Sequence, residues 1–119
     1  MRHRVQKTFR FNHKDTDHRQ AVIRNLLTSF FIHKSIVTTE KRARALQIMA
    51  QKLVNIANEK DKMNAIRKTW KYLFTKESSL ELFNNVAPKY SDKKSGITRI
   101  TAIKFREGDC AKLVKIELV

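Results

Sequence analysis

Acidic residues are scarce in this 119-residue sequence, and long hydrophobic runs are missing. Only 11 Asp and Glu residues stand against 26 Lys and Arg residues, which leaves a formal net charge of +15. A positive charge this large attracts polyanions, so nucleic acid or an anionic membrane surface is the expected partner. The longest apolar cluster, residues 26–32, is interrupted by Thr28 and Ser29 and is much shorter than the roughly 18 residues that a membrane span needs. The sequence therefore predicts a basic protein with no membrane span.

Cysteine is almost absent, which restricts both the cross-links and the setting of the chain. The single cysteine, Cys110, excludes an internal disulfide. The basic N-terminus is not followed by an apolar stretch, so it does not resemble an export signal. Together these observations favour a reducing, cytoplasmic setting.

Patterns typical of metal sites and enzyme active sites are also missing. The histidines form no HxxxH or HExxH motif, and Cys110 has no second cysteine near it, so we expect no metal site. The only glycines are Gly96 and Gly108, which excludes a Gly-rich phosphate-binding loop. The few carboxylates are scattered beside lysines, and no nucleophile has a recognisable base. We therefore expect neither an enzyme nor a cofactor, and no small-molecule substrate.

The first 14 residues carry only positive charge and have no helical or strand periodicity. Phe9 and Phe11 flank Arg10 in this segment. We interpret residues 1–14 as an extended basic arm that becomes ordered on its partner, and residues 15–119 as a single domain. The pattern leaves open whether the two phenylalanines stack on bases or pack on protein.

Apolar residues at helical spacing predict two long helices in the first half of the chain. A stripe over residues 22–31 predicts a helix that starts near residue 17, with Asp15, Thr16 and Asp17 as alternative caps. Phe30 and Phe31 belong to this stripe, so we expect them in the core. The β-branched residues 35–39 predict a short strand, and a second helix should begin directly after it and extend to residue 57.

Two further helices are predicted in the following segment. Residues 63–74 again place apolar residues at helical spacing, and we expect Trp70 among them to lie in the core. Ser78 and Glu81 form a capping box, which predicts the start of a fourth helix. Pro88 should bound that helix because proline cannot donate the next backbone hydrogen bond.

The C-terminal residues predict two strands, 97–106 and 112–118, joined by a turn at residues 107–109. Val114 and Ile116 alternate with Lys115 and Glu117, as expected for a strand with one buried face. With the strand at 35–39, these segments predict an α+β fold in which about four helices pack on a small three-stranded sheet.

Six short strings, in order and in register along the whole chain, resemble one family, the bacterial large-subunit ribosomal protein seventeen. The strings are Met1-Arg2-His3-Arg4, His18-Arg19-Gln20-Ala21 with Arg24-Asn25, Ile36-Val37-Thr38-Thr39, Gly96-Ile97-Thr98-Arg99-Ile100, Arg106-Glu107-Gly108-Asp109 and Ile116-Glu117-Leu118-Val119. The chain departs from the family pattern at Phe9, Phe11, Asp15 and Asp17. It also has Ile97 where the family usually has an aromatic residue.

The resemblance implies a structural constituent of the large ribosomal subunit in the cytoplasm. It implies binding to large-subunit ribosomal RNA near the exit of the nascent-peptide tunnel, with neighbouring ribosomal proteins as further partners. Composition and spacing alone indicate only a nucleic-acid-binding protein. The assignment to the ribosome comes from the resemblance.

We expect the RNA-binding residues in three groups of mostly cationic side chains. Ribosomal RNA is recognised through phosphates, 2′-hydroxyls and unstacked bases, because side chains cannot read its deep major groove. Arginine suits this task through forked hydrogen bonds, and lysine acts as a point charge. The N-terminal group comprises Arg2, His3, Arg4, Lys7, Arg10, Lys14, His18, Arg19 and Arg24. The second comprises Thr38, Thr39, Lys41 and Arg42, and the third Lys89, Tyr90, Lys93, Lys94, Arg99 and Arg106.

Two other classes of protein are compatible with the basic composition, and the start of the first helix is a possible phosphate contact. A free nucleic-acid-binding protein, regulatory or nucleoid-associated, would share the charge, although no helix-turn-helix spacing or dimer seam is evident. A basic nuclease would need a cluster of metal-binding carboxylates, which the sequence lacks. Free amides at the start of the first helix would suit a phosphate, but the carboxylates of Asp15 and Asp17 would compete for them.

Overall fold

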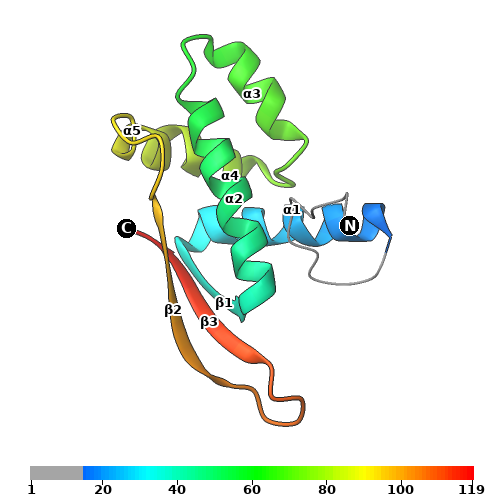
Figure 1. Ribbon diagram of the computed structural model, residues 1–119. Coiled ribbons are helices and arrows are strands. Elements are labelled where there is room, and N and C mark those ends of the chain that lie inside the picture. Colours follow the sequence, from blue (N-terminus) through cyan, green and yellow to red (C-terminus); the bar gives the residue numbers. More distant parts are fainter. Residues whose placement is uncertain (1–14) are drawn as a thin grey trace, which may run out of the picture.

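The computed structural model describes residues 15–119, which form three strands and six helical segments (Figure 1). The predicted α+β class with a three-stranded sheet is confirmed. The predicted arm, residues 1–14, lies outside the described residues. The elements in chain order are α1 (Thr16–His33), β1 (Ser35–Thr39), α2 (Glu40–Ala57), α3 (Lys62–Trp70), α4 (Lys76–Glu81), η1 (Leu82–Val86), α5 (Ala87–Lys89), β2 (Thr98–Phe105) and β3 (Lys112–Leu118).

The sheet has the strand order β1-β3-β2, and both pairs are antiparallel. Its central strand is β3, in which Val114 and Ile116 are buried, as the alternating pattern predicts. The predicted turn closes the β2–β3 hairpin: the Arg106 amide donates to the Ala111 carbonyl at 2.8 Å. Gly108 in this turn has a φ of +99°, a backbone conformation that residues other than glycine adopt rarely.

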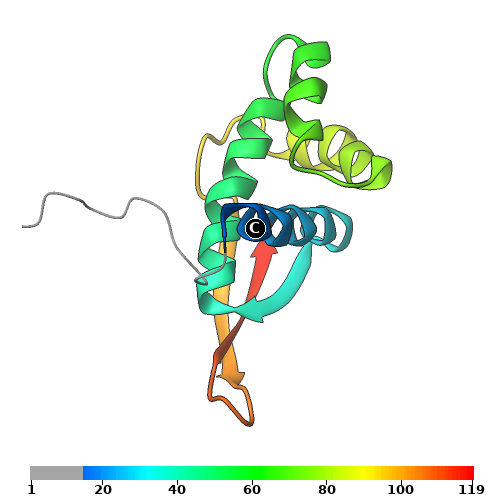
Figure 2. The ribbon, with the colours of Figure 1, turned by 90° about the vertical axis from the view of Figure 1, so that its right-hand side faces the viewer.

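Helix α2 lies in the middle of the molecule, between the sheet and the helical segments α3 to α5 (Figure 1). Its apolar face packs against α1, the sheet and the segments that follow it. The view in Figure 2 shows α1 beside α2, and the hairpin turn pointing away from all the helices. The largest fully buried side chains include Phe30, Phe31, Leu27, Leu46, Leu53, Leu82, Ile97 and Ile116. The core predicted around Phe30 and Phe31 is therefore confirmed.

Both ends of α1 are fixed by side-chain hydrogen bonds. Of the three alternative caps, Asp15 is the N-cap, and its carboxylate accepts from the His18 amide at 2.9 Å. Lys34 ends the helix in the left-handed conformation, with a φ of +65°. Its ammonium group donates to the Phe31 carbonyl at 3.2 Å and to Glu81 at 2.7 Å. The end of α1 is thereby tied to α4.

The predicted capping box at the fourth helix is wrong. Helix α4 begins at Lys76, and Thr75 is its N-cap, with a hydroxyl that accepts from the Ser78 amide at 3.2 Å. Ser78 is instead buried within the first turn. Glu81 is not available to cap, because its carboxylate accepts hydrogen bonds from Lys34 and from Asn85. The helix therefore starts three residues before the predicted cap, Ser78, and the Thr75 hydroxyl alone caps it.

Pro88 does not bound the fourth helix, contrary to the prediction from its sequence position. Helical structure continues through η1 and α5 to Lys89. Residues 82–86 form a π-helical segment, in which the Ala87 amide donates to the Leu82 carbonyl. This wider turn shifts the hydrogen-bond register by one residue immediately before the proline. The helical path can then pass a residue that has no amide hydrogen to donate.

Trp70 does not lie in the core, contrary to the prediction from helical spacing. Helix α3 packs against α2, and its buried side chains are the small Ala65 and Thr69. The large apolar side chains of the same helix, Met63 and Trp70, are 63% and 67% exposed. A small-residue face lets two helices approach closely, so it takes the buried position and the large side chains turn outward.

We predict that Leu53→Ala lowers the free energy of unfolding by about 2–5 kcal/mol, because it leaves a cavity in a fully buried site of α2. Ile48→Ala is the matched control on the same helix, since its side chain is 50% exposed and the change should cost less than about 1 kcal/mol. Urea unfolding followed by circular dichroism measures both. Equal losses in the two variants would contradict the described packing of α2.

Candidate nucleic-acid interface

The start of α1 carries two of the predicted RNA-binding residues. His18 is exposed, and its amide is already bonded to Asp15. Arg19 donates to the Thr16 hydroxyl at 3.2 Å, so its guanidinium lies along the first turn. The capping carboxylate of Asp15 occupies the position that a phosphate would need. The structure thus argues against anion binding by the amides of this helix start.

Arg24, further along α1, has a different environment from His18 and Arg19. Its guanidinium carbon lies 3.9 Å from the centre of the Phe74 ring, a cation–π contact. Its Nε atom is buried and makes no hydrogen bond with the described residues. The Arg24 guanidinium is therefore held by the Phe74 ring, and its Nε donor has no acceptor among the described residues.

The junction of β1 and α2 contains the second predicted group. Thr38 and Thr39 pair with Val114 and Leu113 of β3, and both threonines are half-buried. Thr39 occupies the N-cap position of α2, but its side chain makes no capping hydrogen bond. Lys41 and Arg42 are exposed in the first turn of this helix. The two cations lie where a partner could reach them.

One acidic side chain links this junction to the hairpin. The Glu40 carboxylate pairs with Arg44 at 2.9 Å and approaches the Lys112 ammonium at 3.8 Å. The start of β3, directly after the hairpin turn, is thus brought next to the start of α2. The charge of Glu40 is shared between two cations, and so it does little to offset the positive charge of Lys41.

The third predicted group lies at the end of α5, on the segment that follows α5, on β2 and at the hairpin turn. Lys93 and Lys94 are exposed on a loop that α2 holds in place: the Lys94 carbonyl accepts hydrogen bonds from the side-chain amides of Gln51 and Asn55 at 2.8 and 3.3 Å. Lys89 and Arg99 are also exposed. These side chains are presented on a fixed backbone.

Tyr90 is a correction within this group. It is among the RNA-binding residues predicted from the sequence, where an aromatic side chain would stack on a base, but its side chain is only 2% exposed. Its hydroxyl donates to the Val119 carbonyl, and the Val119 amide donates to the Ile97 carbonyl at 2.9 Å. The ring therefore fastens the end of β3 to the core and has no face available for a base.

Arg106 is engaged within the hairpin turn. Its guanidinium donates two hydrogen bonds to the Asp109 carboxylate, one of them at 3.0 Å. The hydrogen bonds from Arg106 are the main cause that lowers the pKa of Asp109 from 3.8 to about 2, and the same pairing raises the pKa of Arg106. A phosphate at this position would have to compete with Asp109.

The predicted groups do not converge on one pocket. The N-terminal arm lies outside the described residues, so the structure gives no position for Arg2, His3, Arg4, Lys7, Arg10 and Lys14. The other cations are spread over α1, the start of α2, the 89–99 segment and the hairpin. Such a spread suits an extended, irregular polyanion better than a compact ligand. Their contacts with RNA remain predictions.

One basic and aromatic segment was missed by the sequence reasoning. Residues 62–76 contain five cations and no acid: Lys62, Arg67, Lys68, Lys71 and Lys76. Apolar side chains lie between them, and several of these are exposed. The signal was available in the sequence as an acid-free stretch. The helical spacing of Trp70 and its neighbours predicts a core helix, so the stretch does not stand out as a candidate site.

The described residues offer little for other kinds of chemistry. Within residues 15–119, no group of three or more His, Cys, Asp or Glu side chains is placed to hold a metal ion. In the same range no helix combines the length and apolar character that crossing a membrane requires.

Comparison with known proteins identifies one family. Residues 22–119 match the model of a family described as ribosomal protein L17. The match begins after the arm and after the predicted residues His18 and Arg19.

Individual relatives agree with this match. A protein named large ribosomal subunit protein bL17 from Desulforudis audaxviator is 43% identical over 104 residues, which cover 87% of this chain and 92% of the relative. A protein of the same name from Clostridium kluyveri is 41% identical over 104 residues, 87% of this chain and 91% of the relative. Another, from Geobacter sulfurreducens, is 39% identical over 106 residues, which cover 89% of this chain but 60% of that longer relative.

We predict that the Asp109 carboxyl titrates with a midpoint near pH 2 in the folded protein. Because this folded-state pKa lies below the ordinary value of 3.8, the pairing stabilises the turn above pH 3.8 and this stabilisation is lost as the pH falls through about 2. In Arg106→Gln the midpoint should rise towards 3.8. Carbon-detected NMR titration of the side chain measures it.

Lys104→Gln provides the control for this titration, since Lys104 is a nearby exposed cation of the same hairpin with no ion pair to Asp109. Its midpoint should stay near 2. A rise of similar size in both variants would show that general positive charge, and not the Arg106 hydrogen bonds, sets the pKa.

Proposed function

The chain belongs to the ribosomal protein L17 family, and from this premise we propose that it binds large-subunit ribosomal RNA and helps to hold its folded shape. The family consists of structural ribosomal proteins, which confirms the prediction that the chain is not an enzyme. The observation that carries the proposal is the family match over residues 22–119. The net charge of +15 supports the same kind of partner.

The exposed cations of the second and third groups are the proposed RNA contacts among the described residues. Lys41, Lys93, Lys94 and Arg99 are exposed and form no ion pair with another described residue. Because no carboxylate neutralises them directly, each can release counterions from a phosphate when it binds. Contacts to phosphates position a protein on RNA without reading its base sequence.

The proposal also includes the place and the neighbours of the protein. Family membership suggests a position near the exit of the nascent-peptide tunnel, next to other large-subunit proteins, in the cytoplasm. A hydroxyl-radical footprint of the protein on assembled large subunits tests this position. Protection of RNA around the tunnel exit is expected, and protection confined to the interface with the small subunit would contradict it.

We predict that the protein sediments with large ribosomal subunits and remains bound through a high-salt wash. Contacts distributed over the arm, α2 and the 89–99 segment should dissociate slowly, since many must break together. Recovery of the protein only in the soluble fraction would overturn the proposal. Preferential binding to duplex DNA in competition with ribosomal RNA would favour a free nucleic-acid-binding protein instead.

We predict that replacing Arg2, Arg4 and Arg10 together by alanine leaves the fold intact and lowers affinity for large-subunit RNA. For each phosphate that the variant no longer neutralises, the slope of log affinity against log salt should become shallower by roughly 0.7 to 0.9. Binding titrations at several salt concentrations measure the slope. An unchanged slope would count against the arm as an RNA contact.

Lys60→Ala serves as the control for nonspecific loss of charge. Lys60 is exposed, but it lies between Glu59 and Asp61 and belongs to none of the proposed groups. Its replacement should leave the salt slope unchanged within error. A decrease per charge equal to that of the arm variant would mean that total charge, and not the arm, determines binding.

A further inference from the structure

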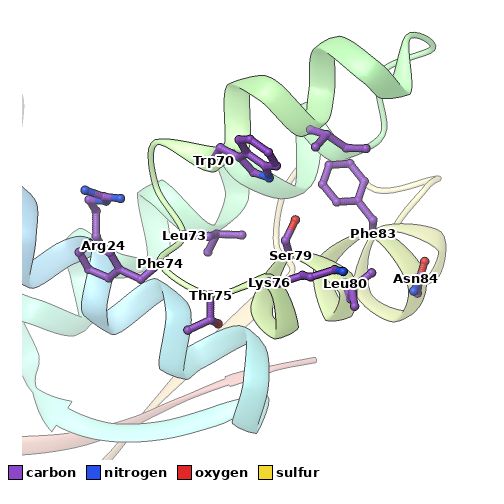
Figure 3. A pocket seen from close by; sticks show the side chains of 11 residues that line it. Arg24, Trp70, Leu73, Phe74, Thr75, Lys76, Ser79, Leu80, Phe83 and Asn84 are labelled. Carbon is purple, nitrogen blue, oxygen red and sulfur yellow. The ribbon is translucent and has the colours of Figure 1, made fainter.

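The apolar face of α3 that was expected in the core borders a cleft instead. Trp70, Leu73 and Phe74 line one side of this cleft, and Leu80 and Phe83 line the other (Figure 3). Its volume is about 630 Å³. Trp70, Phe74 and Leu80 are 67%, 48% and 50% exposed, so the cleft presents aromatic and aliphatic surface to solvent. Exposed apolar surface of this kind marks interaction sites.

The charges of the cleft are all positive. Among its lining residues Arg24 and Lys76 are cationic, and none is acidic. The acid-free segment 62–76, which supplies several of these lining residues, carries further cations. A ligand that complements this cleft has a flat apolar part for the aromatic side chains and a negative charge for the cations.

The position of Arg24 is fixed before any partner binds. Thr28, one turn further along α1, accepts a hydrogen bond from the Phe74 amide at 3.1 Å and donates to the Arg24 carbonyl at 2.8 Å. This places the Phe74 ring against the Arg24 guanidinium, 3.9 Å away. Arginine stacked on an aromatic ring keeps donors at its edge for a phosphate. The Nε atom of this guanidinium is buried without a partner among the described residues, so the contact with a phosphate falls to the terminal nitrogens.

From these observations we infer that the cleft binds an unpaired segment of RNA. The Trp70 indole stacks on an unstacked base, and Arg24 and Lys76 contact the adjacent phosphates. Aromatic side chains interleaved with cations are the usual means of binding single-stranded nucleic acid. This inference rests on the proposed function and adds to it a specific subsite. An acidic apolar peptide would also fit the charge, but it lacks the flat face that an exposed indole and phenyl ring suit best.

The test uses the fluorescence of Trp70, which is the single tryptophan of the chain. The full-length protein is titrated with a short single-stranded RNA, with the duplex of the same sequence, and with inorganic polyphosphate. Stacking of a base should quench the emission. We expect quenching by the single strand, much less by the duplex, whose bases are already stacked, and none by polyphosphate. Equal quenching by polyphosphate would overturn the inference.

Variants separate stacking from general charge. Trp70→Ala should weaken single-strand binding roughly 5- to 150-fold, the loss expected for one stacked base. Trp70→Phe should retain most of the affinity, since it keeps an aromatic face. Phe105→Ala is the matched control, because Phe105 is equally exposed at 67% but lies on the hairpin. An equal loss in Phe105→Ala and Trp70→Ala would overturn the assignment to the cleft.

Binding to whole large-subunit RNA distinguishes the inference from the proposed function. If the wild-type protein binds this RNA without quenching, and Trp70→Ala binds it equally well, the cleft inference fails while the proposed function stands. If the wild-type protein does not bind the RNA, both fail. Quenching that appears only after other ribosomal proteins are added would assign the cleft to a protein partner and overturn the inference. Circular dichroism of each variant checks that the fold is unchanged, as expected for so exposed a side chain.

Discussion

The burial of one face of α2 is the constraint on which the rest of the structure depends. This helix contacts α1, α3, α5, the π-helical segment and all three strands, so it connects the sheet with the helical segments. Ala43, Ala50 and Ala57 recur every seven residues along its buried face. Small side chains at this spacing let several elements approach closely, and Leu46 and Leu53 fill the space between them. A helix with large residues throughout would hold its neighbours further apart.

The elements that depend on local pattern could be predicted from the sequence. Alternation fixes the faces of β3, and the apolar stripe of α1 fixes Phe30 and Phe31 in the core. What the sequence could not give is which face of α3 meets α2, because that choice depends on how closely two helices approach. Trp70 was misplaced for this reason. The path through Pro88 depends on a π turn, for which apolar spacing gives no signal.

The candidate interface was predictable to a similar degree. Exposure of Lys41, Lys93 and Lys94 follows from their place in basic stretches, and the structure agrees. Tyr90 could not be placed correctly, since its burial depends on a contact with Val119 at the far end of the chain. The acidic residues account for some of the cations that do not face a partner. Asp109, Glu81 and Glu59 each form an ion pair with a basic side chain of the same chain. The excess of cations over acids leaves the remaining basic side chains for a partner.

The length of α2 has a further consequence for how the protein exists before it meets RNA. A helix of 18 residues extends about 27 Å at 1.5 Å per residue. The cations at its start and Lys62, whose ammonium group donates to the Ala57 carbonyl at the end of the helix, are therefore separated by much more than the screening length of about 8 Å at physiological salt. Ions in solution shield each group from the other, so their repulsion across the molecule is small. Helix α2 acts as a spacer between like charges, and this helps a chain with a charge of +15 to keep its fold while unbound.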